Sequence, residues 1–152
     1  MIQNIICSFL GTVAFSVVFN VPRRFYMYCG LTGMTGWLTY CLLVQYMSPT
    51  LSTFFGTMVI VLMSRVLAVW RKCPITVFLI SGIFPLVPGT YVYYTAYYFV
   101  RNSLSMAADK GITALKLAFA IVLGIVFIVS IPRQFFSVQY WRERKGKNKV
   151  VT

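Results

Sequence analysis

Residues 74–100 read PITVFLISGIFPLVPGTYVYYTAYYFV, a stretch without a charged residue that is long enough to cross a bilayer as a helix. Its middle holds Pro85-Leu-Val-Pro88-Gly89, where two prolines lack the N–H group that a helix uses and glycine permits unusual backbone dihedrals. We therefore predict a membrane-spanning helix that is broken near its middle. Counted from Pro74, the break begins about 16 Å along the helix, which places it near the bilayer midplane.

Four further stretches with few or no charges flank this one, in a chain with 59% hydrophobic and only 11% charged residues. We predict spans at 1–22, 25–47, 50–70 and 111–132, besides 74–100. The fold class is therefore all-α, a single polytopic membrane domain of about five transmembrane helices over residues 1–133. The first span lacks a basic leader and a small-residue cleavage site, which favours a retained helix over a signal peptide. Residues 134–152 are predicted to form an interfacial cytoplasmic tail with aromatic and basic residues.

The net charge of +12 fits a membrane topology with the N-terminus outside and the C-terminus inside. Two basic pairs, at 23–24 and 71–72, then lie on the cytoplasmic side together with the tail. The outer segments hold only Arg101, Lys110 and Asp109. Because the cations flank separate helices, they argue against a nucleic-acid-binding face and favour the lipid bilayer of the cytoplasmic membrane as their partner.

The residues that catalysis commonly requires are almost absent from this chain. It contains no His, and its only acids are Asp109 and Glu143. A Ser/His/Asp triad, a pair of catalytic carboxylates and a His-rich metal site therefore have almost no residues to be built from. The four cysteines form no C-x-x-C pair, so we expect no metal, no cofactor and no enzyme. Since no span contains a carboxylate, a proton-coupled transporter would need one from another subunit.

Gly30, Gly33 and Gly36 recur every third residue in the span at 25–47. On a helix they fall within a sector of about 120°, where they leave a notch that another backbone can approach closely. The notch serves either packing within the chain or an interface with another subunit. Both interpretations stay open.

Non-helical backbone at the depth of the break is either a kink that neighbouring helices repair or the lining of a cavity, where freed backbone groups bind substrates and ions. The second interpretation supplies a set of candidate substrate-binding residues: Pro85, Pro88, Gly89, Tyr91, Tyr94 and Thr76. Arg65 lies near the inner end of its span, where it either snorkels to the interface or acts as counter-ion for a substrate carboxylate.

Ordered motifs along the chain resemble the threonine/serine exporter (ThrE-like) family. The match is to its small membrane subunit, which corresponds to the C-terminal membrane half of the long exporters. The motifs are FNVPRR at 19–24, YCGLTGMTGW at 28–37, Ser64-Arg65 and CPITVFLISGIFPLVPG at 73–89, and the resemblance ends near Arg133. Asn20 and Pro22 match the family as motif positions, together with the three glycines. The family commonly has proline where this chain has Ser81, so we expect the first part of the break to be less kinked here.

The resemblance implies a secondary exporter in the cytoplasmic membrane for small polar metabolites, such as threonine, serine or a dicarboxylate like succinate. It also implies a larger partner subunit that supplies the other membrane half and a soluble domain. Two alternatives stay open. The chain could be a membrane scaffold that does not transport, or a homo-oligomeric exporter or channel that needs no partner.

Overall fold

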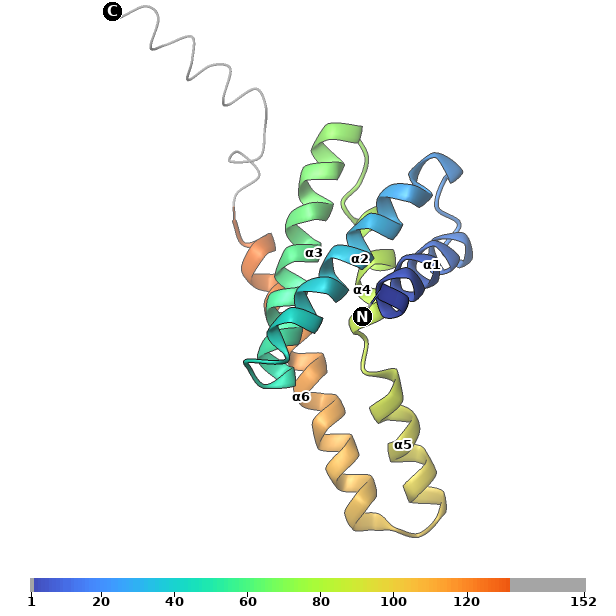
Figure 1. Ribbon diagram of the computed structural model, residues 1–152, viewed down its shortest axis with the longest axis vertical. Coiled ribbons are helices and arrows are strands. Elements are labelled where there is room, and N and C mark those ends of the chain that lie inside the picture. The colour runs from blue at the N-terminus through green and yellow to red at the C-terminus, as the bar shows by residue number, and fades with distance from the viewer. Residues whose placement is uncertain (1, 132–152) are drawn as a thin grey trace, which may run out of the picture.

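The computed structural model describes residues 2–131, and all the regular structure in this range is helical. The elements are α1 (Ile2–Val18), η1 (Arg23–Phe25), α2 (Tyr26–Leu43), α3 (Pro49–Arg71), α4 (Thr76–Ile83), η2 (Phe84–Leu86), α5 (Gly89–Val100) and α6 (Leu104–Val129). Helices α1 to α4 and the second half of α6 form a bundle, and α5 projects from it with the first half of α6 as a hairpin (Figure 1). The predicted tail at 134–152 lies outside the described residues.

Two of these helices, α3 and α6, are long and apolar enough to cross a bilayer. The pair formed by Thr76–Leu86 and α5 makes a third candidate span if its two arms, which are bent by 52°, count as one. Helix α1 is apolar but shorter, and α2 does not meet the same criterion. The sequence-based count of five spans and the N-out orientation therefore remain predictions. Helix α6 begins at Leu104 and not near residue 111 as expected, because its first turns pair with α5.

Three helices end with the same backbone conformation. Asn20, Lys72 and Asn102 adopt the left-handed conformation, with φ of 55°, 53° and 59°. In each case the next N–H group bonds a carbonyl five residues earlier: Val21 to Ser16 at 3.0 Å, Cys73 to Ala68 at 3.1 Å and Ser103 to Tyr98 at 2.9 Å. This Schellman geometry satisfies carbonyl groups that the helix end would otherwise leave unpaired, and it reverses the chain within a few residues. The motif residue Asn20 thus ends α1.

Small residues bring the helices of the bundle close together. A Cβ atom at Gly30 would collide with the Phe9 ring of α1, and one at Gly33 would collide with Thr12. On the same helix, a Cβ atom at Gly36 would collide with Ile60 of α3. The glycine notch of α2 is therefore filled from within the chain, by α1 on one side and α3 on the other.

Most of the buried hydroxyl groups are bonded to the helix that carries them. Ser8 instead donates to the Gly33 carbonyl of α2 at 3.3 Å, and the Ser64 hydroxyl has no partner among the described residues. Thr12 and Ser16 of α1 donate to the carbonyls of Ser8 and Thr12, at 2.7 and 2.8 Å. Thr57 of α3 does the same with Thr53 at 2.8 Å. Because these polar groups are satisfied locally, the buried Ser and Thr residues pack as small side chains between helices.

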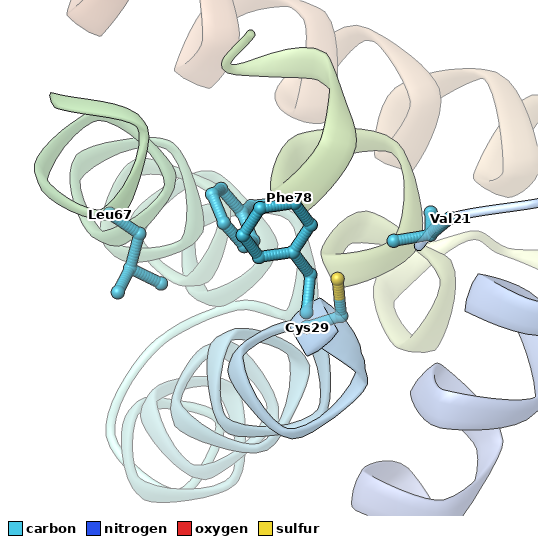
Figure 2. Packing of buried hydrophobic residues seen from close by; sticks show 5 residues of the cluster. Val21, Cys29, Leu67 and Phe78 are labelled. Carbon is cyan, nitrogen blue, oxygen red and sulfur yellow. The ribbon is translucent and has the colours of Figure 1, made fainter. Parts of the chain in front are cut away.

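An apolar cluster lies at the end of the bundle where α1 joins α2 and α3 joins α4. It consists of Val21, Phe25, Cys29, Leu67 and Phe78, each less than a tenth exposed. Phe78 of α4 lies between Leu67 and Val21 in Figure 2, and its ring meets the Phe25 ring edge-on at a centroid distance of 5.5 Å. This cluster ties the first helical arm of the broken pair to three other parts of the chain.

The two basic pairs lie at this same end of the bundle, because the α1–α2 and α3–α4 connections are adjacent there (Figure 1). The Arg71 guanidinium stacks over the ring of Tyr28 at 4.3 Å, and that of Arg24 stacks over Phe25 at 4.7 Å. This shared location agrees with the expectation that both pairs face one side of the membrane.

Candidate functional site at the helix break

The break between α4 and α5 is produced by its prolines. After η2 the chain is extended at Val87, with φ −62° and ψ 130°, and α5 starts after Pro88, with φ −77° and ψ 48°. The Val87 N–H group bonds the Phe84 carbonyl at 3.1 Å, and that of Gly89 bonds the Val87 carbonyl at 2.8 Å. Gly89 does not have a positive φ, so the dihedral freedom that we expected glycine to supply is not used here.

Neighbouring helices hold the first side of the break firmly. Leu86 is buried and packs with Ile60 of α3 and Ile121 of α6. A Cβ atom at Gly56 would lie 3.2 Å from the Leu86 side chain. The Phe84 ring stacks on Phe15 of α1 with a centroid distance of 3.6 Å. Since Ile60 is the middle residue of α3, the break lies within about one helical turn of the centre of that helix.

The second side of the break is the open start of α5. No side chain caps this helix, and Pro88, its N-cap residue, offers no N–H group. Within residues 2–131, the N–H groups of Thr90 and Tyr91 have no hydrogen-bond acceptor. Gly89 and Thr90 are exposed, and a Cβ atom at Gly89 would meet nothing within 4 Å. The positive end of the α5 dipole is therefore accessible to a ligand.

The structure brings most of the sequence-based candidates together at this point. Pro85, Pro88 and Gly89 form the break itself, and Tyr91 and Tyr94 follow on the first two turns of α5. The Tyr91 side chain is half-buried and lies near Tyr40, at the end of α2. Tyr94 is 42% exposed, and its ring stacks on that of Tyr98 at 6.1 Å.

Thr76 and Arg65 lie apart from this group. Thr76 is the first residue of α4 and is separated from Leu86 by about 15 Å of helix. Arg65 is 8% exposed, and its guanidinium donates hydrogen bonds to the carbonyls of Val129 at 2.9 Å and Ile131 at 2.6 Å. It thereby binds the carbonyl end of α6, where a cation is favourable because of the helix dipole.

Trp37 is a residue beside the break that the sequence interpretation did not select. It packs around Ile60, Leu86 and Ile121, and its ring stacks on Tyr40 at 5.2 Å. Its indole Nε1 is fully buried and has no hydrogen-bond partner among the described residues. Only its place in the motif at 28–37 could have drawn attention to it, since an isolated tryptophan in a span is ordinarily read as packing.

The comparisons with known proteins cover the helices that build this site. A family model described as "Threonine/Serine exporter, ThrE" matches residues 4–131, from α1 to the end of α6. An "Uncharacterized protein" from Haemophilus influenzae (strain ATCC 51907 / DSM 11121 / KW20 / Rd) is 29% identical over 94 residues, which cover 61% of this chain and 32% of the relative. The chain thus spans about a third of the length of that curated relative. No solved structure matches this chain.

Proposed function

This chain belongs to the threonine/serine exporter family, and from that premise we propose that it is one membrane subunit of a secondary exporter of small polar metabolites. The proposed substrates are threonine, serine or a dicarboxylate such as succinate, and all of them carry a carboxylate. In this proposal α1, α2, α3, the α4–α5 pair and α6 form five spans of the cytoplasmic membrane, with the N-terminus outside. A larger membrane subunit completes the transporter.

The observation that carries this proposal is the uncapped start of α5 beside a helix break. Broken helices in secondary transporters point their N-termini at anionic substrate groups, because the first N–H groups lack partners and the dipole favours negative charge. Here the free N–H groups of Thr90 and Tyr91 supply these donors. Gly89 leaves space in front of them. A substrate carboxylate is the ligand that this arrangement suits.

Two aromatic side chains add hydrogen-bond donors close to the break. Tyr91 lies in the first turn of α5, and the Trp37 indole N–H group lies buried beside Leu86 without a partner among the described residues. A ligand oxygen that accepts a hydrogen bond from such a buried donor stabilises the complex, because the donor is otherwise unsatisfied. The proposal leaves out Arg65 and Thr76, because Arg65 holds the end of α6 and Thr76 lies far along α4.

The only acid in the described helices is Asp109, which lies in the second turn of α6 and pairs with Lys110 at 3.5 Å. Proton coupling at the break would therefore require an acidic residue from the larger subunit. The glycine face of α2 is filled by α1 and α3. A scaffold that bound its partner through these glycines would have to open its own bundle. This packing supports a transport role over the scaffold alternative.

The test is efflux of labelled threonine, serine and succinate from cells that express this chain with and without a larger subunit of the same family. Gly89→Val fills the open space at the start of α5, and Gly11→Val is the matched control, because a Cβ atom at either glycine meets nothing within 4 Å. We expect Gly89→Val to lower efflux about tenfold or more while the abundance of the protein in the membrane stays unchanged. This magnitude corresponds to the loss of one hydrogen bond to a charged group. Equal effects of the two substitutions on efflux would refute the site.

A further inference from the structure

Among the described helices, only α6 covers α5 to any large extent. None of the α5 residues is buried, and this helix packs against α6 without comparable contact with any other helix. The hairpin of α5 and the first half of α6 projects beyond the bundle in Figure 1. Large apolar side chains are exposed along it, among them Tyr93 at 64%, Phe99 at 66% and Met106 at 57%.

Lys116 lies at the middle of α6, where the hairpin meets the bundle. It is exposed, and its neighbours on the same helix face are Ile112, Phe119 and Leu123, which are 53%, 67% and 59% exposed. Within residues 2–131 Lys116 has no ion-pair partner, and the acid nearest to it in sequence, Asp109, pairs with Lys110 at 3.5 Å. A lone cation therefore lies in an otherwise apolar helix face.

Neither of two positions of the bilayer provides a suitable environment for every side chain of the hairpin. If the bilayer encloses the hairpin, Lys116 lies in hydrocarbon without a counter-ion, which is costly. If the bilayer ends at the level of Lys116, the apolar side chains of the hairpin face water, and exposed patches of this kind mark interaction sites. Either placement leaves a part of the hairpin that the surface of another protein would cover.

We propose that the α5–α6 hairpin is the arm that docks the larger exporter subunit, with Lys116 paired to a carboxylate on a membrane helix of that subunit. This inference rests on the proposed function, which requires such a subunit. Charge complementarity favours this occupant over pairing of Lys116 with Asp109 of a second copy of the chain. Copies related by an axis normal to the membrane place equal residues at equal depth, and Asp109 lies about 10 Å along α6 from Lys116.

The test uses the photoreactive amino acid benzoylphenylalanine, placed at position 119 or 93 of the full chain and co-expressed with a tagged larger subunit. The matched control position is 10, because Leu10 is 59% exposed on α1, away from the hairpin. We expect adducts with the larger subunit from the two hairpin positions and none from position 10. In the position-119 background, Lys116→Glu should reduce the adduct about tenfold or more, because it removes one partner of a charge pair. Lys116→Arg should retain the adduct, and Lys110→Glu is the control for a charge reversal elsewhere on the hairpin.

Adducts between copies of this chain, or with lipid alone, would overturn the docking proposal. Equal adduct yields with Lys116→Glu and Lys110→Glu would overturn the ion pair. If Lys116→Glu does not accumulate in the membrane, the contrast between positions 119 and 10 in the otherwise unchanged chain decides the docking surface. Crosslinking requires no transport, so adducts without efflux would refute the proposed function alone, and efflux without adducts would refute the docking arm alone.

Discussion

Replacing Gly33 by alanine should loosen the contact between α1 and α2. The new Cβ atom would collide with the Thr12 hydroxyl and would lie 2.9 Å from the Thr12 Cβ and Cγ2 atoms. Thr12 has no exposed surface, and its hydroxyl donates to the Ser8 carbonyl at 2.7 Å. The side chain therefore cannot turn away without losing a hydrogen bond, and the two helices have to move apart.

The magnitude follows from three contributions to the free energy of unfolding. Overpacking a close contact costs about 1–3 kcal/mol. Loss of the Thr12 hydrogen bond adds about 1 kcal/mol. The better helix propensity of alanine offsets about 1 kcal/mol of this. We therefore expect Gly33→Ala to lower the free energy of unfolding by about 1–3 kcal/mol.

The assay is reversible unfolding of the purified full chain in mixed micelles, followed by circular dichroism. Gly11→Ala is the control, because a Cβ atom at Gly11 meets nothing within 4 Å and only the helix propensity changes. That variant should be as stable as the original chain or up to about 1 kcal/mol more stable. If Gly33→Ala matches Gly11→Ala, then the packing of α1 on α2 is not the close contact described above.

Three further predictions address other parts of the chain. Arg65→Gln should lower the free energy of unfolding by about 2–4 kcal/mol, because two hydrogen bonds from a charged group to the end of α6 are lost. Efflux should then fall in proportion to the abundance of the protein in the membrane. An altered KM for the substrate would instead indicate that Arg65 binds substrate. In the same micelle assay, Asn20→Gly should keep the free energy of unfolding the same or raise it, whereas Asn20→Val should lower it by about 1–2 kcal/mol. The reason is that φ is 55° at this position, which glycine adopts readily and valine does not. Cys73 should react with a membrane-impermeant maleimide only from the cytoplasmic side, and labelling from outside would contradict the N-out orientation. Burial raises the pKa of this thiol above 9.0, an effect that Arg24 and Arg71 partly offset, so the labelling rate should still increase above pH 9.0.

Local signals explain which parts of the fold were predictable. Uncharged apolar runs indicate membrane helices, and prolines interrupt them, so the order of the helices and the break at Pro85 to Pro88 could be stated from the sequence. The start of α6 was misplaced by seven residues, because the charged pair Asp109 and Lys110 interrupts the apolar run there, whereas the helix continues through this pair and packs against α5.

In the candidate site too, contacts between residues close in sequence were predictable and contacts between distant residues were not. Pro85, Gly89 and Tyr91 are close in sequence, so their proximity in space follows from the break alone. The placement of Arg65 depends on carbonyl groups more than sixty residues away, and no motif in the sequence indicates that contact. Trp37 was missed for a related reason, since its position beside the break comes from the packing of α2 on α3 and η2.

The break lies at a boundary between two kinds of packing, and this location bears on how a site there could work. On one side, Leu86 and Phe84 are held by α1, α3 and α6 through direct side-chain contacts. On the other side, α5 has no buried residue and packs mainly against α6. Segments with few buried contacts have low local stability and supply the moving parts of proteins. A ligand bound at the start of α5 would therefore touch the fixed bundle and the weakly held hairpin at once, which is the arrangement that alternating access requires.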